Sequence, residues 1–68
     1  MKDFCKILIE LRKTNGLTQR EVALSLGISQ PSYIRYENGK AEPTIANLIK
    51  LAELFDVSLD YLCGRTKY

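Results

Sequence analysis

Apolar residues recur at spacings of three and four along most of the chain, and no stretch alternates apolar and polar residues as a half-buried strand does. Phe4, Leu8 and Leu11 form the first such stripe, which stops before Asn15 and Gly16. Because Gly readily adopts the left-handed conformation that ends helices, these residues predict a first helix from about residue 4 to residue 15.

A capping signal marks the start of a second helix. Thr18 stands three residues before Glu21, the spacing of a capping box, in which each side chain accepts a hydrogen bond from the main-chain N–H of the other residue. The second helix is therefore predicted to begin at Gln19 and to end at Gly27.

Only three residues separate this helix from the next predicted one. Ser29 is a favoured N-cap, so the third helix extends from Gln30 to Glu37, where Asn38 and Gly39 end it. A link this short forces the two helices to cross steeply, which makes residues 18–37 a candidate helix-turn-helix motif. By spacing alone the motif is not diagnostic, since many small bundles contain tight helix pairs that bind no nucleic acid.

Two further helices complete the pattern. Thr44, after Pro43, caps a fourth helix, and Ser58 caps a fifth that stops at Gly64. The fold class predicted is all-α, a compact five-helix bundle. The wide apolar face of the fourth helix comprises Ile45, Leu48, Leu51, Ala52 and Phe55.

Length and composition exclude several classes of protein. A chain of 68 residues is expected to form a single domain that buries only about 60% of the surface its unfolded form exposes, which leaves little room for an interior substrate pocket. The absence of His removes the commonest general base and the mixed Cys and His zinc sites, and two Cys cannot complete a four-ligand site. We therefore expect no enzyme activity, no cofactor and no metal.

The cysteines and the first residues indicate a cytoplasmic protein. Cys5 and Cys63 lack redox-motif spacing and are interpreted as reduced thiols, with a single bridge between the two ends of the chain as the alternative. Charges at Asp3, Lys6 and Glu10 interrupt the apolar residues at the start, so it is not a signal peptide, and no apolar run is long enough to span a membrane.

The net charge of +2 is unevenly distributed. Residues 12–40 contain five basic and two acidic residues, for a balance of +3, whereas residues 41–60 contain one basic and four acidic residues, for a balance of −3. This polarity favours a polyanionic partner at one end of the molecule. A solvated surface with uneven charge is the alternative.

The segment LRKTNGLTQREVALSLGISQPSYIRYENGKAEP, residues 11–43, closely resembles the Cro/C1-type (XRE-type) helix-turn-helix family of phage repressors, Cro proteins and bacterial regulators. The similarity continues through VSLDYL at residues 57–62 and covers residues 4–64, so that a single domain, residues 1–68, is expected. The resemblance implies a lambda repressor-like DNA-binding domain.

The resemblance also implies residues that contact DNA phosphates. At the start of the second helix, a main-chain amide and the side chain of Gln19 are expected to hold a phosphate, and Thr18 is expected to take part while also capping the helix. Lys13 is either a weaker contact or simply solvated. The other candidate phosphate contacts are Ser29, Ser32, Asn38 and Lys40.

Three residues of the third helix match base-reading positions. Gln30 is suited to adenine, with a solvated surface residue as the alternative, and Arg35 is suited to a guanine or to a phosphate. Ile34 either contacts a thymine methyl group or lies at the rim of the core. The chain departs from the family at Pro31, which has no donor to offer a base, and at Tyr33, whose ring is expected in the core with its hydroxyl bonded to a partner or to water.

Arg12 and Glu37 match a pair that links the first and third helices in the family. The hypothesis is a partly buried, bidentate ion pair. Because such pairs contribute little net stability, its main effect is to fix the orientation of the third helix. The alternative is two unrelated surface charges.

Together these features predict a sequence-specific regulator of transcription that binds double-stranded DNA, most often a repressor in this family. A homodimer on DNA is expected, reading half-sites about 34 Å apart. The contact between the two copies is expected around Tyr61, Leu62 and Tyr68. The alternative is that these residues belong to the core or to the tail of the chain. The alternative function is a protein-interaction module on the same scaffold, such as an antitoxin that grips a toxin.

Overall fold

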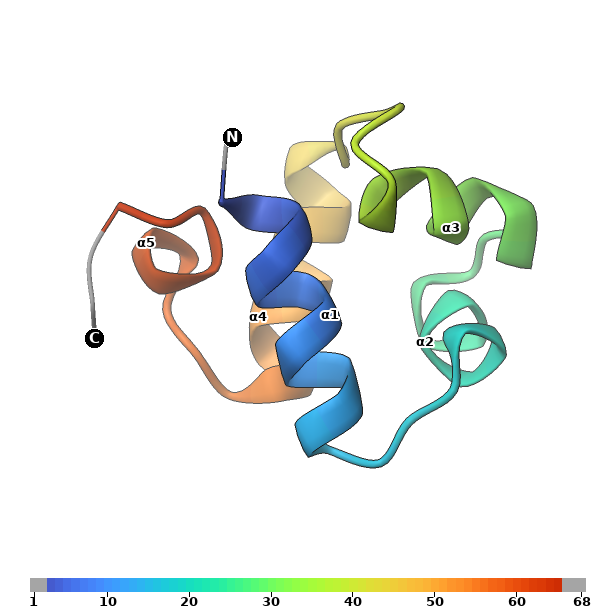
Figure 1. Cartoon of the computed structure of the whole chain (residues 1–68), viewed down its shortest axis with the longest axis horizontal. Coiled ribbons are helices and arrows are strands. Elements are labelled where there is room, and N and C mark those ends of the chain that lie inside the picture. The colour runs from blue at the N-terminus through green and yellow to red at the C-terminus, as the bar shows by residue number, and fades with distance from the viewer. Residues whose placement is uncertain (1–2, 66–68) are drawn as a thin grey trace.

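The computed structural model describes residues 3–65, which form five α-helices and no strand. The helices are α1 (Phe4–Thr14), α2 (Gln19–Leu26), α3 (Gln30–Glu37), α4 (Ile45–Phe55) and α5 (Leu59–Leu62) (Figure 1). The predicted all-α, five-helix class is therefore confirmed. Among the described residues, no helix has both the length and the apolar character needed to cross a bilayer.

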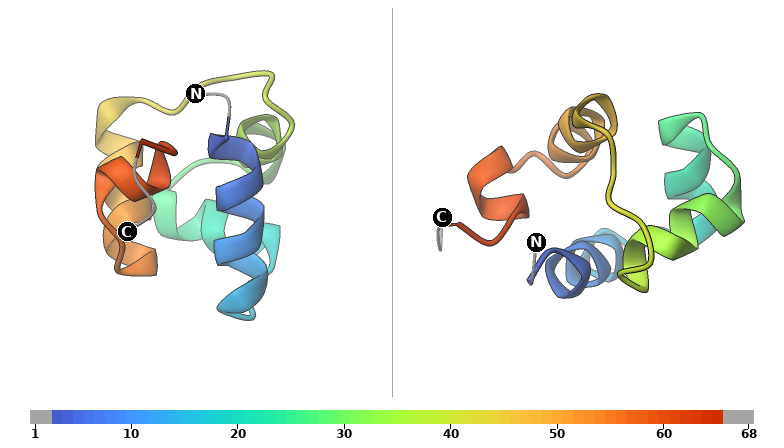
Figure 2. Two further views of the ribbon diagram at one scale, coloured as in Figure 1. Left: turned by 60° about the vertical axis from the view of Figure 1, so that its left-hand side comes forward. Right: turned by 90° about the horizontal axis from the view of Figure 1, so that it is seen from above.

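The helices surround one central core. Seen from above, α1 and α4 lie on opposite sides of it, α2 and α3 close one end, and α5 closes the other (Figure 2). α2 packs against α3 and α4, α3 packs against α1, and α5 packs against both α1 and α4. This arrangement leaves one side of α3 facing away from the bundle.

Local hydrogen bonds set the limits of α2, as the sequence predicts. The capping box is complete, because the Glu21 N–H donates to Thr18 Oγ1 over 3.1 Å and the Thr18 N–H donates to Glu21 Oε1 over 2.9 Å. The helix ends at Gly27, whose φ of 71° lies in the left-handed region. Ser29 then caps α3, so the two helices follow each other with a fixed, three-residue turn.

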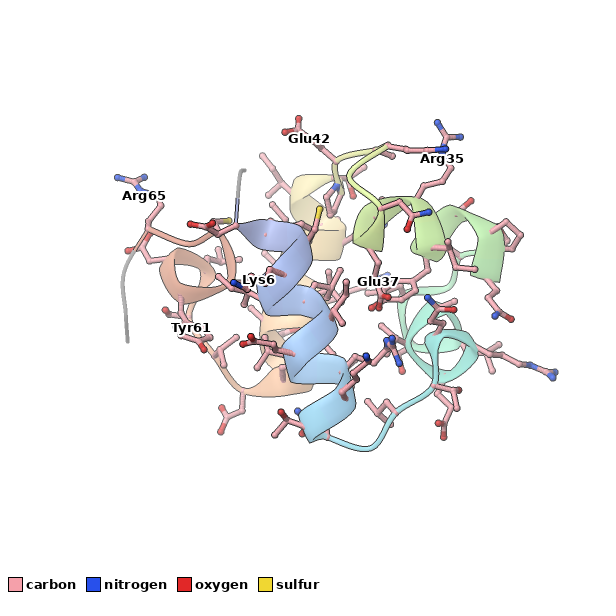
Figure 3. The ribbon with its side chains drawn as sticks, in the orientation of Figure 1. Lys6, Arg35, Glu37, Glu42, Tyr61 and Arg65 are labelled. Atoms are coloured by element: carbon pink, nitrogen blue, oxygen red, sulfur yellow. The ribbon has the colours of Figure 1, made fainter. Side chains whose placement is uncertain are left out.

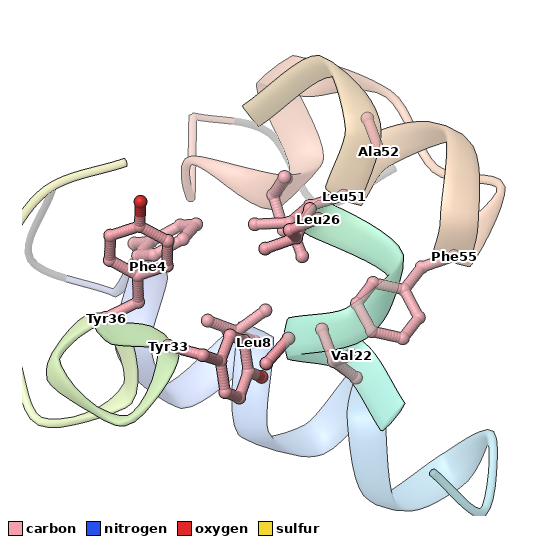
Figure 4. Close-up of a cluster of buried hydrophobic side chains, with 11 residues drawn as sticks. Phe4, Leu8, Val22, Leu26, Tyr33, Tyr36, Leu51, Ala52 and Phe55 are labelled. Carbon is pink, nitrogen blue, oxygen red and sulfur yellow. The ribbon is translucent and has the colours of Figure 1, made fainter. Parts of the chain in front are cut away.

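Buried side chains from all five helices form the core (Figure 4). Tyr33 and Leu8 are fully buried at its centre, and the Tyr33 and Tyr36 rings meet edge to face, with centroids 6.3 Å apart. The buried set is Phe4, Leu8, Val22, Ala23, Leu26, Tyr33, Tyr36, Leu51, Ala52, Phe55 and Leu62.

Ile45 does not join the apolar face of α4, contrary to the sequence-based expectation, and is 76% exposed. It is the first residue of the helix, and side chains on a helix tilt toward its N-terminus. The Ile45 side chain therefore projects beyond the packed part of the helix.

Leu62 belongs to the core, which was the alternative to a dimer contact, because this side chain is completely buried. α5 lies against α1 and α4, and Leu62 is the residue by which it joins the core. Tyr61 is half-buried, and Tyr68 lies outside the described residues.

The two cysteines are free thiols, so the alternative of a bridge between them does not hold. The Cys5 thiol donates a hydrogen bond to the main-chain oxygen of Tyr36 over 3.3 Å. Cys5 thereby helps to join α1 to α3.

Truncating Leu8 to Ala is expected to lower the free energy of unfolding by about 2–5 kcal/mol, because a fully buried side chain leaves a cavity. Urea denaturation measures this loss. Leu24→Ala is the matched control, since Leu24 is 69% exposed and its truncation should change stability by less than about 0.5 kcal/mol. Equal losses in the two variants would contradict the core described above.

Candidate nucleic-acid interface

A buried carboxylate lies where α1, α2 and α3 meet. Glu37, in the last turn of α3, is 7% exposed. Arg12 of α1 binds it in a bidentate manner, with Nε 2.6 Å from Oε2 and Nη2 3.2 Å from Oε1. The ion pair that the sequence suggests between α1 and α3 is thus present, with side chains that are 13% and 4% exposed.

Two further donors reach the same carboxylate. The Tyr33 hydroxyl donates to Oε2 of Glu37 over 2.5 Å, and Gln19 Nε2 donates to Oε1 over 3.0 Å. Each carboxylate oxygen therefore accepts two hydrogen bonds. The remaining Arg12 nitrogen, Nη1, donates to the main-chain oxygen of Leu17 over 3.1 Å, which also ties the start of the motif to α1.

These contacts keep the pair charged. Burial acts to raise the pKa of Glu37, but the hydrogen bonds from Arg12, Tyr33 and Gln19 outweigh it and lower the pKa below its ordinary value. The hydrogen bond to Glu37 raises the pKa of Arg12. Burial, followed by the bond to the carboxylate, raises the pKa of Tyr33, so this residue stays a neutral donor.

The other side of α3 faces solvent. Arg35 points away from the molecule, whereas Glu37, two residues later, points into it (Figure 3). Gln30, Pro31 and Arg35 are exposed, and Ile34 is half-buried, so it lies at the rim of the core and still presents part of its surface. The three base-reading candidates, Gln30, Ile34 and Arg35, therefore share an accessible side of one helix.

The two serine candidates are bonded to each other at the start of α3. Ser29 Oγ accepts the Ser32 N–H over 3.2 Å, as a helix cap does, and donates to Ser32 Oγ over 2.9 Å. The Ser32 hydroxyl keeps its own hydrogen to donate. Of the two, Ser32 is thus the better placed to reach a phosphate, while Ser29 mainly caps the helix.

The start of α2 lies beside the end of α3, because Gln19 bonds to Glu37. The Thr18 N–H is occupied by Glu21, so any main-chain donor to a phosphate comes from Gln19 and Arg20, the first two helical residues. Arg20 is exposed and is absent from the sequence-based candidates. Its place in the first turn of the motif's first helix makes it a further candidate for a phosphate contact.

Asn38 and Lys40 are exposed in the turn after α3. The main-chain N–H groups of Lys40 and Ala41 both donate to the Arg35 oxygen, over 2.9 and 3.3 Å, which folds the turn back over the helix end. Lys40 is therefore held beside the last turn of α3. Lys13 is exposed in the last turn of α1.

The helix-turn-helix family model matches residues 8–62, which include α2, α3 and the carboxylate cluster between them. The chain belongs to this helix-turn-helix family, of the Cro/C1 (XRE) type. The segment-by-segment resemblance noted in the sequence is thereby confirmed.

Curated relatives are similar to most of this chain. The cryptic phage CTXphi transcriptional repressor RstR of Vibrio cholerae is 45% identical over 58 residues, which is 85% of this chain and 52% of that protein. The antitoxin PezA of Streptococcus pneumoniae is 39% identical over 62 residues, 91% of this chain and 39% of that protein. The chain thus spans about half the length of the curated relatives it matches.

A solved transcriptional regulator has the same fold. The crystal structure of a transcriptional regulator from Listeria innocua superposes with a TM-score of 0.88 at 32% sequence identity. The superposition covers 96% of this chain and 61% of that one.

Glu37→Ala is expected to lower the free energy of unfolding by about 3–5 kcal/mol, because the variant leaves Arg12 without its buried partner. Chemical denaturation measures the loss. Glu53→Ala, which removes an exposed carboxylate from α4, is the control and should stay within about 0.5 kcal/mol of wild type. A loss no larger than that of the control would contradict the conclusion that the Glu37 contacts among α1, α2 and α3 stabilise the fold.

Tyr33→Phe is expected to make the protein more sensitive to acid. The pKa of Glu37 is lowered in the folded state, so its stabilisation is complete above the ordinary value of 4.5 and is lost as the pH falls through the folded value. Removing the hydroxyl donor raises the folded pKa, so acid unfolding begins at a higher pH. Circular dichroism against pH measures the midpoint, and Tyr61→Phe, at a half-buried tyrosine, should leave it unchanged.

Proposed function

We propose that this chain is the DNA-reading domain of a transcriptional regulator, binds double-stranded DNA in a sequence-specific way and acts as a repressor. One observation carries the proposal: Glu37 anchors α3 from the inside, while Gln30 and Arg35 stand exposed on its outside. In a helix-turn-helix protein, the second helix of the motif lies in the major groove and the first helix crosses the backbone.

In this arrangement the outer side of α3 reads bases. The Gln30 amide is suited to adenine N6 and N7, and Arg35 to guanine O6 and N7 or to a phosphate. Phosphates are contacted by groups around α3, which fix its register on the duplex. These groups are Thr18, Gln19, Ser29, Ser32, Asn38 and Lys40, and we add Arg20 because it is exposed in the first turn of α2.

The exposed charges support a polyanionic partner. Arg12 and Glu37 neutralise each other inside the protein. Between residues 12 and 40, four cations are exposed, against one exposed acid, Glu21. The cations are Lys13, Arg20, Arg35 and Lys40. The positive balance predicted from the sequence therefore lies on the surface of the motif and of the residues that flank it, where it attracts phosphates.

The proposal extends to a homodimer on DNA and to action in the cytoplasm. One domain of this size makes few contacts with bases, and two copies that read half-sites about 34 Å apart provide the affinity that one lacks. Residues 4–64 are taken as the folding unit, and DNA reading requires no catalytic group, metal or cofactor from them.

A protein-interaction role is the second candidate, because the antitoxin PezA is 39% identical to this chain. An antitoxin-like module would bind a partner protein with little or no affinity for duplex DNA. The dependence of binding on salt distinguishes the two functions, because phosphate contacts release counterions and protein contacts between neutral surfaces do not.

The protein is expected to select related duplexes from a random pool and to lose affinity steeply as the salt concentration rises. Mass measurement of the complex should give two chains per duplex. Failure to bind any duplex at low salt would contradict the proposed function and favour the protein-interaction role.

Arg35→Ala is expected to weaken binding to the selected duplex. If Arg35 meets a guanine, the loss is about 1–3 kcal/mol and discrimination at one base pair disappears. If it meets a phosphate, the loss is similar for all sequences and the slope of log affinity against log salt falls by about 1. Lys50→Ala, which removes an exposed cation from α4, is the control and should leave both the affinity and the slope near their wild-type values.

A further inference from the structure

The side of α3 that faces away from the core is partly apolar. Pro31 is exposed and Ile34 is half-buried. Residues three apart on a helix are neighbours on its surface, so these two side chains present adjoining apolar groups between Gln30 and Arg35. Neither Pro31 nor Ile34 has a polar side-chain atom, so neither can read the hydrogen-bonding edge of a base.

The start of α3 has few main-chain donors for a phosphate. Pro31 has no N–H, the Ser32 N–H donates to Ser29 Oγ over 3.2 Å, and the Tyr33 N–H donates to the Ser29 oxygen over 3.1 Å. Of the main-chain N–H groups in the first turn of α3, this leaves at most that of Gln30 to bind a phosphate. The start of α2, by contrast, retains the N–H groups of its first two residues. The two helix starts therefore differ in chemistry, with phosphate suited to α2 and a base surface suited to α3.

Only one base offers an apolar group in the major groove of unmodified DNA, and that group is the C5 methyl of thymine. An A·T pair presents it beside adenine N6 and N7, which are the groups that a Gln amide binds in a bidentate manner. Gln30, the residue before Pro31, supplies such an amide. The polar and apolar groups at the start of α3 thus complement A·T pairs.

We propose that Pro31 and Ile34 form a contact surface for the thymine methyl group and make the protein specific for thymine at a defined place in each half-site. The inference rests on the proposed function, because it requires α3 to lie in the major groove. It assigns a recognition role to Pro31, a position that has no hydrogen-bonding group.

The test changes the DNA and leaves the protein intact. In the duplex selected from a random pool, each thymine is replaced in turn by uracil, which pairs with adenine in the same way and lacks the methyl group. The expected result is a loss of affinity of about fourfold at one position of each half-site, the factor that corresponds to burying one methyl group, and no change at the other thymines.

A protein variant then assigns the contact. Pro31→Ala keeps a residue that the first turn of a helix accepts, and it should reduce the ratio of thymine to uracil affinity at the sensitive position toward one, while the ratios elsewhere stay unchanged. Ile34→Ala should reduce the same ratio. Leu24→Ala removes an apolar side chain that is 69% exposed on α2, and as the control it should keep the ratio of the wild type.

The outcomes separate this inference from the proposed function. Sequence-specific binding with equal affinity for thymine and uracil at every position would overturn the methyl contact and leave the proposed function intact. A uracil effect that persists undiminished in both Pro31→Ala and Ile34→Ala would also overturn it. Absence of binding to any duplex would overturn both proposals.

Discussion

The carboxylate of Glu37 is the one charged group in the described part of the chain that is buried, and four hydrogen bonds end on it. Its partners come from α1, α2 and α3 itself. With fewer partners the buried carboxylate would lower the stability of the fold, because an unpaired charge in the interior costs several kcal/mol of folding free energy. The bonds from Arg12 and Gln19 therefore restrict the orientation of α3 relative to α1 and α2, while the Tyr33 bond, within α3, holds the carboxylate in place.

This restriction matters more for geometry than for net stability. Ion pairs in the interior gain little over apolar residues of similar size, whereas their directional bonds distinguish one packing from its close alternatives. The apolar core, centred on Leu8 and Tyr33, supplies the stabilisation, and Glu37 selects the angle at which α3 is presented. Tyr33 serves both purposes, because its ring is in the core and its hydroxyl is on the carboxylate.

Much of the fold follows from local signals. The limits of α2 and α3 agree with prediction because the Thr18 capping box, Gly27 and Ser29 act over a few residues. The pattern wrongly places Ile45 in the packed face of α4 and leaves Leu62 open between the core and a dimer contact, because periodicity indicates an apolar face without showing where neighbouring helices end. The bond from Gln19 to Glu37 spans 18 positions in sequence, and no pattern in the chain identifies it. The partner of the Tyr33 hydroxyl, Glu37, is likewise set by the packing of the core and not by a sequence pattern.

The turn between α2 and α3 holds the motif together with the Glu37 contacts. This affects which residues of the protein can change over evolutionary time. Gln30, Pro31 and Arg35 are exposed and belong neither to the core nor to the carboxylate cluster. Substitution at these positions carries little penalty in folding, because the side chains are exposed, do not cap a helix and belong to no buried network. Under the proposed function, the preferred DNA target can thus diverge one residue at a time while the scaffold stays the same.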